Sequence, residues 1–276
     1  MKNIVITPAV GLEFSPVEFF IKSLRKYYQD DVYFLVGPKD HDLKNGLKSY
    51  NCKFYEVNVH KYDIQLRRYK FFSNILQKNN NYDKVLFCDC RDVYFQSNPF
   101  EYDYKGGINF FQEDIKFNES IYNTNWMIKT FGRKIYDELS NKTVCCGGTV
   151  LGTVDNMITW LNLMNTLVLK YTFPKRLKYL LTFRRDKNGR GCDQAHGNYI
   201  VNKNYFKDSF LYSNKEGPIA TVYYLKQIKF NEKSQLINDL GAPYSVVHQY
   251  DKRWSEFSEK VNFLKNQLNI MEPQFK

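Results

Sequence analysis

Two aspartates follow a short apolar run that has the character of a buried strand. Residues 84–88 read K-V-L-F-C, uncharged from Val85 onward, and Asp89 and Asp92 come soon after. Carboxylates at the end of a central strand are costly to bury unless a cation joins them. Because Mg²⁺ and Mn²⁺ bind carboxylate and phosphate oxygens, the pair predicts a divalent metal site. The alternative is structural: Asp89 caps the next turn and Asp92 pairs with Arg91 or another base.

The elements that would position this pair alternate between strand and helix patterns. The first expected helix opens with Ser15 as N-cap and Pro16 in its first turn. Such a series forms parallel strands joined by right-handed crossovers, and ligands bind beyond the carboxyl ends of those strands. Residues after Val10, Gly37 and Cys88 should therefore line one crevice. The expected strands are 3–10, 32–36, 52–57 and 84–88, and the expected helices are 17–28, 39–50 and 62–77.

The second half of the chain is less regular. It has no internal repeat and no Gly/Ser-rich linker, which predicts a single domain over 1–276. The fold class is therefore α/β, with a mostly parallel central sheet flanked by helices. The expected strands here are 107–112, 144–151 and 205–211, and the expected helices are 126–139, 154–171 and 193–202.

The composition fits a sizeable globular core, with 43% hydrophobic and 17% aromatic residues among 276. The net charge of +11 implies an anionic partner, such as nucleic acid, substrate phosphates, an anionic membrane or an acidic glycan. The six cysteines lack zinc-finger spacing and are expected to be free and mostly buried.

No secretory signal and no uncharged run of ~20 residues is present, which predicts a cytoplasmic protein. A peripheral membrane contact stays open through the basic segment 175–190, for which a solvated loop is the alternative.

The residues after the fourth strand resemble a known signature. They read D-C-R-D-V-Y-F-Q-S-N-P-F from Asp89 to Phe100. This is similar to the D-x-R-D-V-x-F-Q-x-x-P-F form of the DxD motif in glycosyltransferases with the glycosyltransferase-A fold. The resemblance implies Mn²⁺ or Mg²⁺ on the aspartates and the diphosphate of a nucleotide-sugar donor on the metal. Because the spacing is D-x-x-D, Asp92 is the safer ligand. Asp89 binds the metal directly or through water, or contacts the donor ribose beside Cys90.

Two earlier segments are similar to the same family. The end of the first strand, with Thr7, Pro8 and Ala9, stands where that fold holds the nucleotide base and ribose. Arg68, or Arg67 beside it, stands where a family arginine reaches the nucleotide from the helix before the DxD strand. For either arginine, a solvated helix face is the alternative.

Two later segments also resemble the family. Gly147 and Gly148 resemble the strand that passes beneath the donor sugar, where glycine permits close backbone approach, although a bulge explains them equally well. Asp193 and Gln194, followed by Asn198, resemble the D-Q-x-x-x-N start of a helix that faces the acceptor. The resemblance implies that Asp193 accepts the acceptor's proton or orients the acceptor, while a plain N-cap is the alternative.

The C-terminal segment 246–254, V-V-H-Q-Y-D-K-R-W, resembles the histidine motif of these enzymes. The resemblance implies that His248 completes the metal site with the two aspartates. It also implies that Lys252 and Arg253 contact the diphosphate. A histidine that merely ends a strand is the alternative.

Together the resemblances cover most of the chain and imply one glycosyltransferase domain. Residues 1–100 would form the nucleotide-binding half, 101–254 the acceptor half and 255–276 a C-terminal tail. The implied reaction moves a sugar from a nucleotide-sugar, by default a UDP-sugar, to a glycan or glycoconjugate. Asp193 and Asp114 are the candidate bases, and the stereochemical outcome stays open.

Two other classes of function compete with this reading. A nucleic-acid-binding protein would explain the pI of about 9.2 and the many aromatic residues, but no RRM, KH or helix-turn-helix signature is present. A metal-dependent phosphodiesterase or nucleotidyltransferase would use the same aspartates, but it leaves the C-terminal motif unexplained. We therefore expect no nucleic-acid partner.

Overall fold

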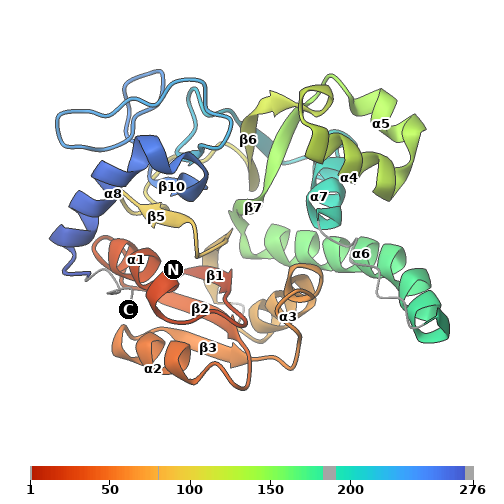
Figure 1. The fold of residues 1–276 in the computed structure, drawn as a ribbon, viewed down its shortest axis with the longest axis horizontal. Helices are drawn as coiled ribbons and strands as arrows, with labels where there is room; N and C mark the ends of the chain where they lie inside the picture. Colours follow the sequence, from red (N-terminus) through yellow and green to blue (C-terminus); the bar gives the residue numbers. More distant parts are fainter. Residues whose placement is uncertain (1, 80, 183–190, 271–276) are drawn as a thin grey trace.

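The computed structural model describes residues 2–79, 81–182 and 191–270 (Figure 1). Its central layer is a seven-stranded sheet in the order β3-β2-β1-β4-β7-β6-β8. All neighbours in this sheet run parallel except β7, which is antiparallel to both β4 and β6. The expectation of an α/β fold with a mostly parallel central sheet flanked by helices is confirmed. The strands are β1 (Lys2–Pro8), β2 (Asp31–Val36), β3 (Lys53–Glu56), β4 (Tyr82–Cys88), β6 (Ile108–Lys116), β7 (Thr143–Thr153) and β8 (Ser209–Tyr212).

Helices α1 (Ser15–Arg25), α2 (His41–Ser49) and α3 (Ile64–Lys78) connect the first four strands, as the sequence pattern predicts. The N-cap expected at Ser15 is wrong. The helix begins at Ser15 itself, and Phe14 precedes it as an N-cap residue without a side-chain hydrogen bond.

Each face of the sheet carries its own hydrophobic core, because successive strand residues point to opposite sides. Ile4 and Ile6 of β1 belong to the cluster that includes Phe72 of α3. Val5, between them, belongs to the cluster that includes Phe20 of α1. Helices α3 and α1 therefore pack against opposite faces of the sheet at β1.

The second half departs from the expected elements in two places. The single helix expected at 126–139 is two helices, because Gly132 between them has a φ of +84°. The helix expected at 154–171 continues to residue 182, and the side chains of the basic segment 175–190 lie outside the described residues. The elements are the 3₁₀ turn η1 (Phe117–Glu119) and helices α4 (Ile121–Phe131), α5 (Arg133–Leu139), α6 (Val154–Thr182) and α7 (Cys192–Asn202).

A second, three-stranded sheet in the order β5-β10-β9 was not expected from the sequence. Its strands are β5 (Val93–Phe95), β9 (Ile219–Thr221) and β10 (Val246–His248), and β10 runs antiparallel to β5. The 3₁₀ turn η3 (Tyr250–Arg253) and helix α8 (Trp254–Gln267) follow. In the part that the structure describes, the expected C-terminal tail is helical as far as Gln267, and α8 lies beside α1 (Figure 1). Phe257 and Val261 of α8 share a hydrophobic cluster with Phe19 of α1. Within the described residues, no helix is long and apolar enough to cross a membrane.

Candidate metal-binding site

Three side chains converge beyond the carboxyl end of β4. Nε2 of His248 lies 3.7 Å from Oδ1 of Asp92 and 3.9 Å from Oδ2 of Asp89. One ligand atom from each residue lies within 4.8 Å of the others, so the cluster could hold one metal ion. His248 is only 1% exposed, and its Nε2 has no hydrogen-bond partner. A buried polar atom without a partner is costly, and a cation between the three groups would remove that cost. The donor set therefore fits a metal.

The small sheet brings His248 to the aspartates. β10 pairs with β5 so that His248 lies opposite Val93, the residue after Asp92. Just beyond this pair, the backbone N–H of Gln249 donates to the Asp92 carbonyl at 2.8 Å. Backbone pairing therefore brings His248 next to Asp92.

Gly148 on β7 leaves room for the cluster. A Cβ atom on Gly148 would lie 2.6 Å from Oδ2 of Asp89 and 2.6 Å from Cε1 of His248. The Asp89 N–H donates to the Gly148 carbonyl at 2.9 Å, which holds the two backbones together. Gly148 thus permits a close approach to the side chains of Asp89 and His248, and its expected place beneath a donor sugar stays a prediction. The neighbouring Gly147 faces Gln194, whose Cα would lie 3.3 Å from an added Cβ.

Cys146 holds the other side of the imidazole. Its Sγ lies 3.2 Å from Nδ1 of His248 and accepts the Gly148 N–H at 3.4 Å. All six cysteines are free and buried, as expected, but Cys146 does more than fill space. Burial lowers the pKa of His248, and the neighbouring Cys146 and the aspartates outweigh it, raising that pKa to about 10.

Burial acts on Asp92 in the opposite sense. It raises the pKa of the Asp92 carboxyl, and the nearby His248 only partly offsets this. A buried carboxylate and a buried imidazole with shifted pKa values are typical of a functional site. A bound cation would favour the charged carboxylate and the neutral imidazole together.

Arg68 connects the cluster of Asp89, Asp92 and His248 to helix α7. The guanidinium, 4% exposed, contacts Oδ1 of Asp89 at 2.7 Å and Oδ2 of Asp193 at 3.1 Å. It also donates to the Gly147 carbonyl at 3.3 Å. The structure thus places Arg68 at the aspartates. Burial raises the pKa of Asp193 and Arg68 opposes this, so Asp193 is held as one half of an ion pair.

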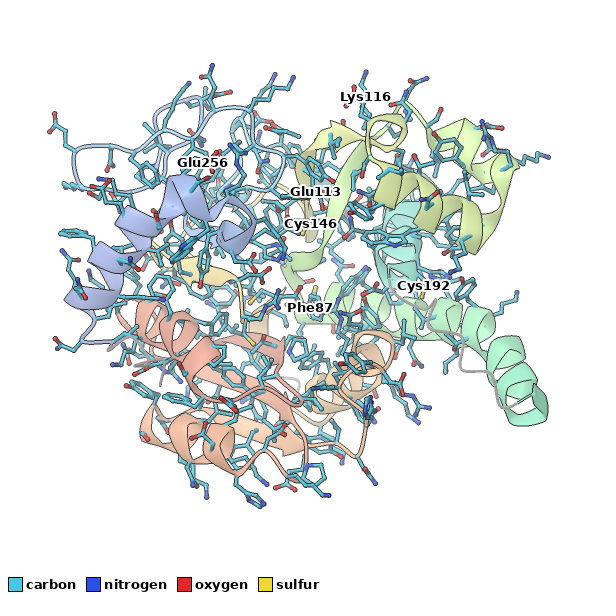
Figure 2. The ribbon with its side chains drawn as sticks, viewed as in Figure 1. Phe87, Glu113, Lys116, Cys146, Cys192 and Glu256 are labelled. Carbon is cyan, nitrogen blue, oxygen red and sulfur yellow. The ribbon has the colours of Figure 1, made fainter. Side chains whose placement is uncertain are left out.

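A buried glutamate on β6 was missed by the sequence reading. Glu113, 2% exposed, accepts a hydrogen bond from Gln194 at 3.2 Å, and burial raises its pKa to about 7. Glu113 and Cys146 are labelled near the centre of the molecule in Figure 2. The expected candidate Asp114 instead hydrogen-bonds with Asn214 and lies near Lys215, because successive strand residues face opposite ways. The Asp114 side chain is therefore directed toward Asn214 and Lys215, whereas Glu113 is directed toward Gln194.

The side chain of Asn198, part of the helix start expected to face the acceptor, bonds to the backbone of β7. Its amide accepts the Cys145 N–H at 2.7 Å and donates to the Cys145 carbonyl at 2.8 Å. Asn198 therefore ties α7 to β7, and both of these hydrogen bonds are structural.

The residues expected at the nucleotide lie at the same edge of the sheet. Thr7 and Ala9 are fully buried, and the Ala9 side chain belongs to the hydrophobic cluster that also contains Phe20 of α1. Cys90 is also buried and donates through Sγ to the Pro8 carbonyl at 3.3 Å. The ends of β1 and β4 are therefore in contact beside Asp89.

The basic residues after His248 have protein partners. Arg253 donates to the Leu225 carbonyl at 2.8 Å and pairs with Glu256, which anchors the start of α8. Lys252 is half-exposed and contacts Asp251 at 3.4 Å. In this arrangement Lys252 keeps more freedom to reach a ligand than Arg253.

No protein-family model matches the chain, and no curated protein matches it in sequence. The assignment of a function therefore rests on the site.

Proposed function

We propose that the chain is a metal-dependent glycosyltransferase of the glycosyltransferase-A fold, which moves a sugar from a nucleotide-sugar to a glycan or glycoconjugate. The observation that carries the proposal is the convergence of Asp89, Asp92 and the unpartnered Nε2 of His248 at the carboxyl end of a central strand. This is where open α/β sheets bind their ligands. The motifs at these residues are those that resemble the family.

Asp89, Asp92 and His248 would hold Mn²⁺ or Mg²⁺. The mixed set favours Mn²⁺, because Mg²⁺ is usually held by oxygen ligands alone. The bound ion would neutralise charge on the diphosphate leaving group. The imidazole must be neutral to bind, and Cys146 at Nδ1 keeps Nε2 directed at the carboxylates.

The remaining residues orient the donor and keep the site rigid. Pro8 and Cys90 would border the nucleoside at the joined ends of β1 and β4. Arg68 fixes Asp89 and couples it to Asp193, so that Asp193 orients the acceptor side. Lys252 would add a positive charge near the diphosphate.

Nucleotide binding tests the proposal. UDP or GDP with Mn²⁺ should raise the melting temperature, because a ligand that binds only the folded state adds about 2.7 kcal/mol at a concentration one hundred times Kd. EDTA should abolish the shift. A screen of nucleotide-sugars with Mn²⁺ should then find one that is hydrolysed.

The same experiment separates the competing classes of function. Tight, salt-sensitive binding of RNA or DNA without any response to nucleoside diphosphates would contradict the proposal. Cleavage of a phosphodiester with no release of sugar would also contradict it.

A further inference from the structure

Gln96 directly follows β5, and its side chain is buried, with only 4% exposed. The side-chain amide pairs with the backbone of Leu236: Nε2 donates to the Leu236 carbonyl at 3.0 Å, and Oε1 accepts the Leu236 N–H at 2.7 Å. Nε2 also donates to the Tyr244 carbonyl at 2.8 Å. The amide of Gln96 therefore makes three hydrogen bonds, all to backbone groups of one distant segment.

That segment, residues 222–245, connects β9 to β10 (blue in Figure 1). It is irregular, with isolated bridges that pair Phe230 with Leu236 and Ile237 with Pro243. The Tyr244 N–H donates to the Leu236 carbonyl at 3.1 Å, so two distant parts of the segment meet where Gln96 binds. Gln96 therefore fixes the part of the segment that leads into β10.

The pairing of β10 with β5 is closed by a backbone hydrogen bond at each end. At one end the Gln96 N–H donates to the Ser245 carbonyl at 2.9 Å, and at the other the Gln249 N–H donates to the Asp92 carbonyl. Between them, β10 has only three residues, and the last is His248. Because side chains alternate between the two faces of a strand, a slip of one residue would turn His248 away from Asp92.

We propose that Gln96 is a positioning residue for the metal site, whose side-chain amide holds β10 in the register that directs His248 at Asp89 and Asp92. The inference rests on the metal site of the proposed function. Gln96 acts through the backbone of residues 236–248, and its side chain binds neither the ion nor the substrate.

The chemistry of the amide explains why a glutamine suits this position. The backbone of residues 236–244 presents two carbonyl oxygens and one N–H group to the Gln96 side chain. A primary amide has two N–H donors and one oxygen acceptor, which matches this set, whereas a carboxylate only accepts and a thioether does not donate. Losing the amide would leave buried backbone groups without partners, which favours rearrangement of the segment.

The test measures binding of Mn²⁺ alone, and of Mn²⁺ with UDP, to the full chain. The free Mn²⁺ signal in electron paramagnetic resonance gives the affinity. Gln96→Met keeps an unbranched side chain of similar length and removes all three hydrogen bonds. It should weaken Mn²⁺ binding by about 10–100-fold, the usual cost of losing a group that orients a metal ligand. Gln96→Glu, which keeps only the acceptor, should also weaken it.

Asn109→Leu is the matched control. Asn109 on β6 is 1% exposed, and its amide also accepts one backbone N–H and donates to two carbonyls, those of Gly106 and Leu151. This variant loses the same number of buried hydrogen bonds without touching β5 or β10. It should lower the melting temperature and bind Mn²⁺ as tightly as the wild type.

A double variant separates positioning of His248 from general destabilisation. If Gln96 acts through His248, then Gln96→Met combined with His248→Gln should lose no more Mn²⁺ affinity than His248→Gln alone. Independent effects would instead multiply. A double variant whose loss equals the product of the two single losses would overturn the inference.

Thermal unfolding first establishes which variants are folded, and Gln96→Glu replaces Gln96→Met if the latter is unfolded. Wild-type Mn²⁺ affinity in a folded Gln96 variant, or an equal loss in Asn109→Leu, would overturn the inference. So would unfolding of both Gln96 variants under conditions in which Asn109→Leu stays folded, because the role of Gln96 would then be structural.

Failure of the proposed function gives a different result. A wild type that binds Mn²⁺ but hydrolyses no nucleotide-sugar would overturn that function alone, and the comparison of Mn²⁺ affinities would still decide the role of Gln96. A wild type that binds no Mn²⁺, with or without UDP, would overturn both.

Discussion

The sulfur of Cys146 lies 3.2 Å from Nδ1 of His248, on the opposite side of the ring from the two aspartates. The imidazole is thus held by one nitrogen while the other, Nε2, faces Asp89 and Asp92 without a partner. Metal-binding histidines usually show this arrangement, with the second nitrogen fixed by a neighbouring group. Here the neighbouring group is a thiol rather than a carbonyl or carboxylate.

Replacing Cys146 by alanine should weaken Mn²⁺ binding by about 10–100-fold, the usual cost of losing a group that orients a metal ligand. Cys146→Ser keeps a polar atom near Nδ1 and should lose less. Cys52→Ala, at a buried cysteine beside Tyr50 and Arg25, is the control. Titration of the thermal shift with Mn²⁺ at fixed nucleotide measures the effect, and equal affinities in all four proteins would contradict it.

Gly148→Ala should abolish the response to metal, because the new methyl group would lie 2.6 Å from both Oδ2 of Asp89 and Cε1 of His248. Gly197→Ala, in α7, is the matched control. An added Cβ there meets nothing within 4 Å. Since alanine favours helices over glycine, Gly197→Ala should stabilise the fold by about 0.5–1 kcal/mol. Thermal unfolding is measured with and without Mn²⁺ plus nucleotide. Gly148→Ala should show no shift in melting temperature with the ligands, whereas Gly197→Ala should show the wild-type shift.

Asp92→Asn should remove hydrolysis of the nucleotide-sugar and leave the protein folded. The buried carboxylate is the charge that the metal would neutralise, and the amide cannot replace it. Asp137→Asn, in an exposed ion pair with Arg133, should retain wild-type activity. EDTA should reproduce the defect in the wild type. An unfolded Asp92→Asn protein, or full activity in EDTA, would instead indicate a structural ion pair between Asp92 and His248.

A structure with nucleoside diphosphate and Mn²⁺ bound should place Nε2 of His248 about 2.0–2.5 Å from the ion, the ordinary range of ligand distances. Asp92 should bind the ion directly. A ring turned away from the ion by more than the width of a water would remove His248 from the ligand set and leave the aspartates.

Local patterns were sufficient to predict the first half of the fold. The strand before Asp89 ends in an unbroken run of apolar residues, 85–88, and all of them are fully buried. The apolar spacing that predicts α3 also places Arg68 on its buried face. Both predictions need only the chain's periodicity and the rule that parallel strands share one ligand-binding edge.

Other parts of the site depend on contacts between distant segments. β5 and β10 are each three residues long, too short for a periodic signal, so their pairing could not be predicted. His248 was identified from a resemblance rather than from any pattern of its own. Irregular pairing between β6 and β7 hides which carboxyl group, Glu113 or Asp114, faces the site. No spacing in the sequence links Cys146 to an imidazole on another sheet.

The pKa of His248 makes the stability of the metal-free protein depend on pH. Its folded-state pKa of about 10 lies above the ordinary value of ~6.5. Below pH ~6.5 both folded and unfolded states carry the proton, so the stabilising contribution is complete. As the pH rises from ~6.5 toward 10, the unfolded state loses this proton first, and the free energy of unfolding should fall.

Metal binding should show the opposite pH dependence, because the ion displaces the proton from Nε2 of His248. Between pH 6.5 and 9 the wild type should lose stability in EDTA and gain affinity for Mn²⁺ with nucleotide. His248→Gln removes the imidazole and should make both the unfolding free energy in EDTA and the affinity for Mn²⁺ less dependent on pH. Glu113, with a pKa of about 7, leaves a residual pH dependence of the unfolding free energy below that pH. Subtracting the variant's unfolding free energy from that of the wild type isolates the contribution of His248. A difference in unfolding free energy that stays constant between pH 6.5 and 9 would contradict the prediction. It would show that the imidazole is already neutral in the folded protein, so that Cys146 and the aspartates do not stabilise its protonated form.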